Sequence, residues 1–261
     1  MKDKIRGYWD RRAVDYDENV RNILYSPREN REWKRIFSQG LGSVKMNSAE
    51  LKDAKMTSAE MKILDVGTGP GIVATILSSL GNQVTGIDPS REMLERAGIN
   101  AKRSKQPLVF VQGDAENLPF MDGSFDAVVS RFVLWNLPHP DKAMIEWKRV
   151  LRPGGKVLVI DGTWYDHDDS PLKIKLWQFL STPLIMLTER RIPRYSSMNS
   201  EIKESLWSTV ARRPQADVRL LERAGFEKIH VLEDIYRKSL TNLDYLKNGH
   251  WGRTFMITGV K

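Results

Sequence analysis

The residues of this chain that could do chemistry begin with a glycine-rich turn. Gly67, Gly69 and Gly71 follow an apolar run that ends at Asp65 and Val66. Glycine has no Cβ, so the backbone at such a turn can approach a ligand closely. The helix expected after the turn would present free N–H groups and the positive end of its dipole. This arrangement is typical of a nucleotide or nucleoside site.

A carboxylate follows at the end of the next apolar run. Asp88 ends the segment Gly86-Ile87-Asp88, about 20 residues after the turn, where a carboxylate can accept hydrogen bonds from both hydroxyls of a ribose. Dinucleotide-binding enzymes share this pair of signals, but their turn reads G-x-G-x-x-G. Here the turn reads G-x-G-x-G. The pattern predicts an adenosine-containing cofactor and leaves open which one.

The elements that must position these residues alternate along the chain. Short apolar runs predict strands at 62–66, 83–88, 108–112, 125–130, 156–161, 226–235 and 254–260. Amphipathic patterns predict helices at 3–40, 71–80, 90–102, 141–151 and 214–224. Alternation of this kind predicts a mostly parallel sheet with helices on both faces.

Composition limits the possible chemistry. The chain has 261 residues and no cysteine, which excludes disulfides, thiolate metal sites and cysteine nucleophiles. The N-terminal residues are charged and show no secretory signal. The longest apolar stretch, 176–187, is too short and too interrupted to span a bilayer. We therefore expect a cytoplasmic protein.

The net charge of +8 is unevenly distributed. Residues 171–213 contain eight Lys or Arg and three Glu, so +5 of the net charge lies in this segment. This excess could be a solvated face, or it could attract an anionic substrate, a nucleic acid or a membrane surface.

Five segments occur in a diagnostic order: Leu64–Gly71, Gly86–Ser90, Gln112–Phe120, Phe125–Ser130 and Leu151–Lys156. Together they resemble the class I S-adenosylmethionine-dependent methyltransferases, and most closely the small-molecule branch that includes the ubiquinone and menaquinone methyltransferases. The resemblance covers about residues 60–165. We therefore expect an α/β fold with a Rossmann-like, seven-stranded, mostly parallel sheet, helices on both faces, the last strand antiparallel and an inserted helical cap.

The expected organisation has four parts. Residues 1–60 form an N-terminal helical lid with an insertion, and residues 61–162 form the cofactor-binding core. Residues 163–213 form a substrate cap, and residues 214–261 complete the core sheet. Within the first part, Met46–Lys52 recurs as Met56–Lys62, which we interpret as a duplicated surface insertion without chemistry.

The resemblance implies S-adenosylmethionine as cofactor. Asp65 would receive its ammonium, Asp88 its ribose diol and Asp114 its adenine amine, and Met93 would cover a face of the adenine. The implied cofactor-binding residues are Asp65, Gly67, Thr68, Gly69, Gly71, Asp88, Pro89, Met93, Gly113, Asp114, Ala115, Arg131 and Tyr16.

Methyl transfer from a sulfonium needs mainly alignment of the acceptor, with a general base only for an acceptor that arrives protonated. The candidate catalytic residues are His139, after the fourth strand, and His167, after the fifth; either could instead be a surface histidine. The candidate substrate residues are Tyr8, Trp135, Trp164, Tyr165, Arg190 and Arg194. We expect no metal site, because the acidic residues near His167 are consecutive and rarely converge on one ion.

The sequence thus predicts a methyltransferase that moves a methyl group to a small organic acceptor, anionic or lipophilic, by proximity and in-line displacement. Two alternatives stay open: a nucleic-acid or protein methyltransferase, and a cofactor-binding regulator without catalysis. Against a nucleic-acid enzyme, the fourth strand ends in Ser130-Arg131-Phe132-Val133 and lacks the Asn/Asp-Pro-Pro-aromatic segment that stacks a flipped base.

Overall fold

The computed structural model describes residues 1–42, 60–164, 171–189, 198–235 and 254–261. The 43–59 part of the duplicated segment lies outside these ranges, as do Tyr165, His167, Arg190 and Arg194.

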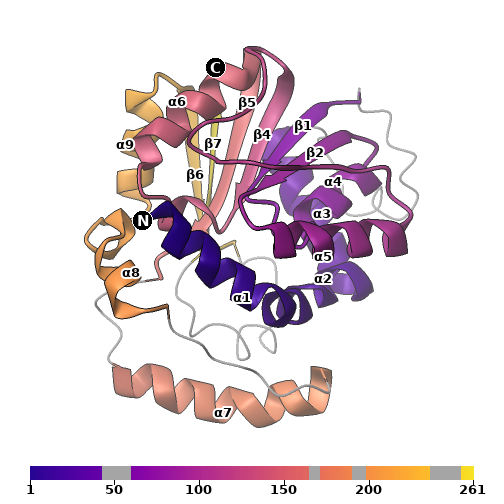
Figure 1. Cartoon of the computed structure of the whole chain (residues 1–261), viewed down its shortest axis with the longest axis vertical. Coiled ribbons are helices and arrows are strands. Elements are labelled where there is room, and N and C mark those ends of the chain that lie inside the picture. Colours follow the sequence, from indigo (N-terminus) through magenta and orange to yellow (C-terminus); the bar gives the residue numbers. More distant parts are fainter. Residues whose placement is uncertain (43–59, 165–170, 190–197, 236–253) are drawn as a thin grey trace.

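A seven-stranded sheet forms the centre of the molecule, with the order β3-β2-β1-β4-β5-β7-β6 (Figure 1). The strands are β1 (Lys62–Val66), β2 (Gln83–Asp88), β3 (Val109–Gln112), β4 (Phe125–Arg131), β5 (Leu151–Gly162), β6 (Glu227–Glu233) and β7 (Thr254–Val260). Strands β1 to β5 are parallel, and β7 runs antiparallel to both β5 and β6. The predicted Rossmann-like sheet is confirmed. Its order reverses between β1 and β4, and open α/β sheets bind ligands at the carboxyl edge at such a point.

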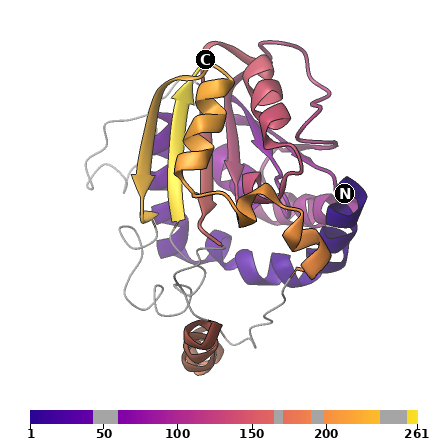
Figure 2. The same ribbon diagram turned by 90° about the vertical axis from the view of Figure 1, so that its left-hand side faces the viewer.

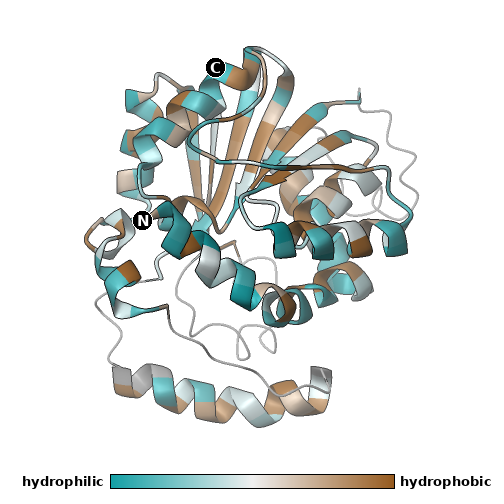
Figure 3. Ribbon diagram, viewed as in Figure 1, coloured by the Kyte–Doolittle hydropathy of each residue, from teal (hydrophilic) through white to brown (hydrophobic). Residues whose placement is uncertain are grey.

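Helices cover both faces of this sheet. On one face lie α2 (Asn22–Tyr25), α3 (Pro27–Leu41) and α4 (Ile72–Ser79), and on the other lie α6 (Pro140–Val150) and α9 (Gln215–Arg223). Trp147 of α6 and Phe37 of α3 are fully buried in the two cores. Figure 3 shows the sheet as the most apolar part of the fold, as expected for strands that are buried on both faces.

Helix α1 (Lys2–Val20) crosses the carboxyl edge of the parallel strands (Figure 1). It is fixed to α5 (Arg91–Ser104) by a buried amide: the Asn100 Nδ2 donates to Asp17 Oδ1 at 2.8 Å and to the carbonyl of Pro70 at 2.9 Å. Because Pro70 belongs to the glycine turn, one side chain joins the N-terminal helix to the ligand-binding edge.

Two further helices lie in the region predicted as a cap. Helix α8 (Ser200–Glu204) packs near α1, and α7 (Pro171–Glu189) stands apart from the labelled helices and strands in both views (Figures 1 and 2). The division of the chain into four parts stays a prediction.

Most predicted boundaries differ from the observed ones by one or two residues, and two differences are larger. The region predicted as helical over 3–40 contains three helices. The last of them begins at Pro27, because the Ser26 Oγ accepts from the Glu29 N–H and so caps α3. Strand β5 begins at Leu151 and not at Lys156, because the buried Leu151 pairs with Phe125 before the register shifts.

Candidate functional site

The glycine turn is shaped by contacts that exclude a side chain. Gly67 has a φ of 67°, and a Cβ there would lie 2.3 Å from Val133 Cγ2. The N–H groups of Gly67 and Thr68 both donate to the carbonyl of Ile87, at 2.8 and 3.0 Å. The turn is thus held against β2 and leaves its open side to the carboxyl edge of the sheet.

Asp88 lies at the centre of this edge. Its Oδ2 accepts from the Gly69 N–H at 2.9 Å, and its Oδ1 accepts from the Ser90 N–H at 2.9 Å. The residue is buried, yet it lines a cavity of about 400 Å³. A carboxylate oxygen has two lone pairs, so each oxygen can accept one further hydrogen bond from the cavity.

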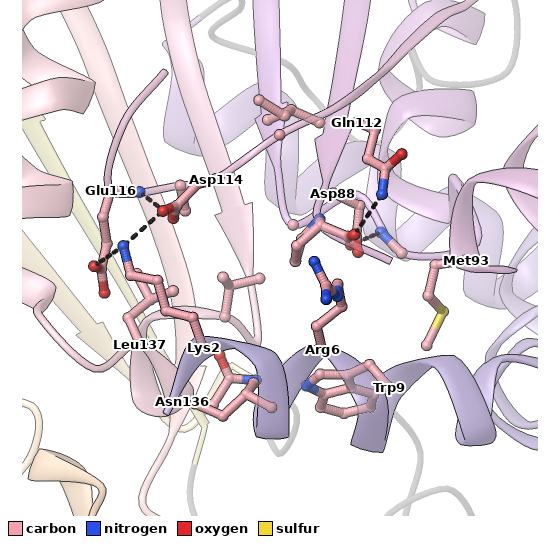
Figure 4. Close-up of a pocket in the computed structure, with 18 of the residues that line it drawn as sticks. Lys2, Arg6, Trp9, Asp88, Met93, Gln112, Asp114, Glu116, Asn136 and Leu137 are labelled. Atoms are coloured by element: carbon pink, nitrogen blue, oxygen red, sulfur yellow. Dashed lines mark hydrogen bonds and ion pairs between the residues drawn. The ribbon is translucent and has the colours of Figure 1, made fainter. Parts of the chain in front are cut away.

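The cavity lies between the carboxyl edge and α1 (Figure 4). Most of the predicted cofactor residues line it: Tyr16, Gly67, Gly69, Asp88, Pro89, Met93, Gly113, Asp114, Ala115 and Arg131. The wall also includes Ile87, Gln112 and Glu116. Helix α1 adds residues such as Lys2, Arg6 and Trp9, and the segment after β4 adds Phe132, Val133, Asn136 and Leu137. A volume of this size is within the range of small-molecule sites.

Three predicted cofactor residues lie behind the wall. Asp65 is 1% exposed, and its Oδ2 accepts from the Thr68 hydroxyl at 2.6 Å. Gly71 caps the N-terminus of α4 with a φ of 75°. These residues support the turn, and a direct contact of Asp65 with a ligand stays a prediction.

The two buried carboxyl groups have raised pKa values. Burial raises the pKa of Asp65 to about 7, against hydrogen bonds from Thr68 and backbone that lower it. Burial likewise raises the pKa of Asp88 to about 6, partly offset by the N–H groups of Ser90 and Gly69. Both groups therefore hold protons more tightly in the folded chain than in the unfolded one.

This difference predicts a pH dependence of folding. The stabilising effect of the tighter proton binding is fully present below the unfolded pKa of about 4, and it is lost as the pH rises through 6 and 7. We expect these two groups to lower the free energy of unfolding of the cofactor-free protein by roughly 2–4 kcal/mol between pH 5 and pH 8. Urea unfolding across this range measures it. Asp65→Asn, which does not titrate, should remove most of the slope, and an unchanged slope would contradict the assignment.

Asp114 has partners in the fold already. Its Oδ1 accepts from the Glu116 N–H at 2.9 Å, and its Oδ2 lies 2.6 Å from the Lys2 ammonium. Lys2 also lies 2.5 Å from Glu116 Oε2. Helix α1 is thereby tied to the predicted adenine end of the cavity. An adenine amine at Asp114 would share this carboxylate with Lys2, and that contact stays a prediction.

Phe132, which also lines the cavity, has a strained backbone and lies among aromatic side chains. Phe132 has a φ of 61°, a conformation that destabilises a non-glycine residue by roughly 1–2 kcal/mol. Its N–H donates to the carbonyl of Ile160 at 2.8 Å, and its ring meets Trp164 edge-on at 4.9 Å. The Arg131 guanidinium lies 4.3 Å from the Phe132 ring and 4.5 Å from the Trp33 ring. Backbone strain of this kind concentrates at functional sites.

Helix α1 is also connected to the segment after β4. With its amide oriented to satisfy both neighbours, Asn136 accepts from the Trp9 indole N–H at 3.0 Å and donates to the carbonyl of Val133. The predicted substrate residues Tyr8 and Trp135 lie beside this contact but do not line the cavity. They pack in an apolar cluster with Ile5, Met198, Ile202 and Leu206.

His139 is not brought to the cavity. It is exposed at the start of α6, where its N–H donates to Glu116 Oε1 at 2.7 Å. The structure gives it a backbone role and no place in the wall. Among the residues that the structure describes, no three His, Asp or Glu side chains gather in a way that could hold a metal ion.

A buried cluster of charged residues, Arg213, Asp161 and Asp217, is linked to Trp164. The Arg213 guanidinium lies 2.9 Å from Asp161 Oδ2, and its Nε donates to Asp217 Oδ2 at 2.8 Å. Asp161 in turn accepts from the Trp135 N–H at 3.0 Å and from the Trp164 indole at 2.9 Å. Burial raises the pKa of Asp217, although Arg213 opposes the rise. The cluster thus fixes the Asp161 carboxylate, which in turn holds the Trp135 backbone and the Trp164 indole.

Removing the cation from this cluster should destabilise the fold strongly. Arg213→Met leaves Asp161 and Asp217 buried without their counter-ion, and we expect a loss of about 3–5 kcal/mol in the free energy of unfolding. Arg91→Met is the matched control, because the Arg91–Glu95 pair is exposed on both sides and worth about 0–1 kcal/mol. Chemical denaturation compares the two, and equal losses would argue against a buried triad.

Sequence reasoning missed several residues of this site. Lys2 and Arg6 line the cavity, and Arg213 supports it. Lys2, Arg6 and Arg213 carry no local signal, because their roles depend on contacts between distant parts of the chain.

Comparison with known proteins places these features in context. Residues 64–159 match the family model described as a methyltransferase domain. The demethylmenaquinone methyltransferase of Paenarthrobacter aurescens is 30% identical over 229 residues, which cover 87% of this chain and 80% of that protein. The ubiquinone/menaquinone biosynthesis C-methyltransferase UbiE of Bartonella bacilliformis is 31% identical over 80% of this chain and 81% of that protein. A SAM-dependent methyltransferase of Aquifex aeolicus has a TM-score of 0.51 at 20% identity, over 77% of this chain and 81% of that chain, which is a likeness of fold.

Proposed function

This chain belongs to the class I S-adenosylmethionine-dependent methyltransferases of the ubiquinone and menaquinone type, and from that premise we propose that its cavity binds S-adenosylmethionine and admits a lipophilic quinol as methyl acceptor. The observation that carries the proposal is the Asp88 carboxylate, which faces the cavity beneath the glycine turn at the reversal of strand order.

The residues present fit this cofactor. A Cβ at Gly67 would collide with Val133, so the glycine lets the turn and the segment after β4 form one wall of the cavity. Asp88 keeps two acceptor positions for a ribose diol. Met93 and Ile87 lie on the wall beside Asp88, where apolar side chains can cover a flat base. Gly69, Arg131 and Phe132 line the same cavity, which is where the methionyl chain would lie.

The bound cofactor supplies an electrophilic methyl group on a sulfonium. The chain's own part is to bind, orient and exclude water. Asp88 fixes the ribose, and the turn keeps the methionyl end against its backbone. The strained Phe132, with Arg131 and Val133, borders the space left for the acceptor. Well-aligned reactants reach effective molarities of about 10⁵–10⁸ M, so alignment alone can supply much of the rate.

The acceptor class comes from the relatives, whose names specify demethylmenaquinone and ubiquinone or menaquinone biosynthesis. The apolar and aromatic wall around Phe132, Val133 and Leu137 suits a quinol ring. The site offers no comparable argument for a nucleic acid or a protein acceptor. The cytoplasmic location stays a prediction.

Methyl transfer from labelled cofactor tests the proposal. The purified chain receives reduced demethylmenaquinone in one reaction and total RNA or protein extract in the others. We expect label in the quinol alone. Label in RNA or protein would support the alternative acceptors. Tight cofactor binding without transfer to any of them would support a regulator.

A further inference from the structure

Helix α7 carries an exposed apolar surface that the proposed function does not use. Leu172 is 77% exposed, Phe179 75% and Leu187 81%. Among the side chains of this helix that the structure describes, the large exposed apolar ones are Leu172, Leu176, Phe179, Leu180, Met186 and Leu187, which we call the α7 stripe. Large apolar side chains rarely gather at the surface without a binding role.

The spacing of the stripe is helical. At 3.6 residues per turn, its six positions fall within an arc of about 120° along a length of roughly 22 Å. Ser181 and Ile185, which are buried, fall on the opposite side of the helix. The stripe is therefore one continuous outer face, and the inner face is already covered.

Basic residues border the stripe. Between Leu172 and Thr188 the only charged residues are Lys173 and Lys175, and the first acidic residue is Glu189 at the end of the helix. The helical repeat puts positions 173 and 175 just outside the two edges of the arc. An apolar stripe bordered by positive charge complements a layer with anionic groups at its surface and an apolar interior.

The position of α7 leaves this face accessible. Figures 1 and 2 show α7 separate from the other labelled elements, on the side of the carboxyl edge where α1 lies. Figure 3 shows apolar residues along its length. None of the helices in the described ranges is long and apolar enough to cross a membrane.

We propose that α7 docks this protein on an anionic membrane. The helix lies in the interface, with the α7 stripe among the acyl chains and the exposed Lys175 at the headgroup phosphates. This goes beyond the proposed function, since it concerns where the protein works and does not depend on the acceptor. It also brings the carboxyl edge, and with it the cavity, to the side of the membrane.

Vesicle co-sedimentation of the full chain tests the proposal. We expect binding to vesicles of phosphatidylcholine with phosphatidylglycerol, weaker binding to phosphatidylcholine alone, and release by salt. The variant L176S/F179S/L180S should lose about 100-fold in vesicle affinity. The variant K173Q/K175Q should lose about 10-fold on the anionic vesicles only.

The control is M121S/V210S, which removes two apolar side chains that are even more exposed, from other parts of the surface. It should bind vesicles like the wild type. Circular dichroism and transfer to a short-chain, water-soluble quinol check that each variant is folded, and separate this inference from failure of the proposed function. Vesicle binding that is absent in the wild type, or equal in the stripe variant, overturns the proposal. If the wild type is a dimer that does not bind vesicles, and the stripe variant is a monomer, the stripe binds a second copy of the chain instead.

Discussion

Asp88→Ala should abolish measurable binding of S-adenosylmethionine by titration calorimetry. The substitution removes the carboxylate that would accept two ribose hydroxyls, and hydrogen bonds to a charged group are worth about 1.5–3 kcal/mol each. A combined loss of about 3–6 kcal/mol lowers affinity by at least about 100-fold.

The fold should survive this change, because the Asp88 carboxylate is itself destabilised by burial. The variant leaves the N–H groups of Gly69 and Ser90 without this acceptor, so some stability is lost as well. Asp88→Asn is the matched variant: it keeps one oxygen acceptor and should bind with intermediate affinity. If a folded Asp88→Ala protein bound the cofactor with wild-type affinity, the ribose could not bind the Asp88 carboxylate.

Gly67→Ala should also eliminate cofactor binding, for a steric reason. The new Cβ would lie 2.3 Å from Val133 Cγ2, so the turn or the segment after β4 must shift. Because both line the cavity, either shift changes its shape. The positive φ of 67° adds a strain of roughly 1–2 kcal/mol. Calorimetric titration and urea unfolding measure the two effects separately.

Gly81→Ala separates strain from collision. Gly81 has a φ of 86°, and no atom lies within 4 Å of its missing Cβ. This variant should lose roughly 1–2 kcal/mol of stability and bind the cofactor normally. Adding Val133→Ala to Gly67→Ala should restore part of the binding. Normal binding by Gly67→Ala itself would mean that the close approach to Val133 does not shape the site.

The sheet could be predicted from the sequence because its signals are local. Buried parallel strands such as Lys62–Val66 are short apolar runs, and the turn glycines mark where the chain must bend tightly. The positions of Gly67 and Asp88 follow from the same local pattern, since the carboxyl ends of β1 and β2 meet at one edge.

The resemblance predicts an N-terminal lid and Tyr16 within it, and Tyr16 lines the cavity. The contacts that hold α1 in place could not be predicted in the same way. Lys2 meets Asp114 across 112 residues, and Asn100 meets Asp17 across 83. Such contacts depend on how the helices pack, and the sequence near Lys2 contains no sign of them. The placement of His139 shows the converse. A histidine after β4 suits a catalytic base by position, but the start of α6 turns it to the exterior.

A crystal structure of the protein grown with S-adenosylhomocysteine tests the central claim most directly. The account predicts the ribose diol on the Asp88 carboxylate, with the amino-acid end beside Gly67 and Gly69 and the sulfur directed toward Phe132. A ribose bound elsewhere, or a cavity that stays without ligand at saturating concentration, would contradict it.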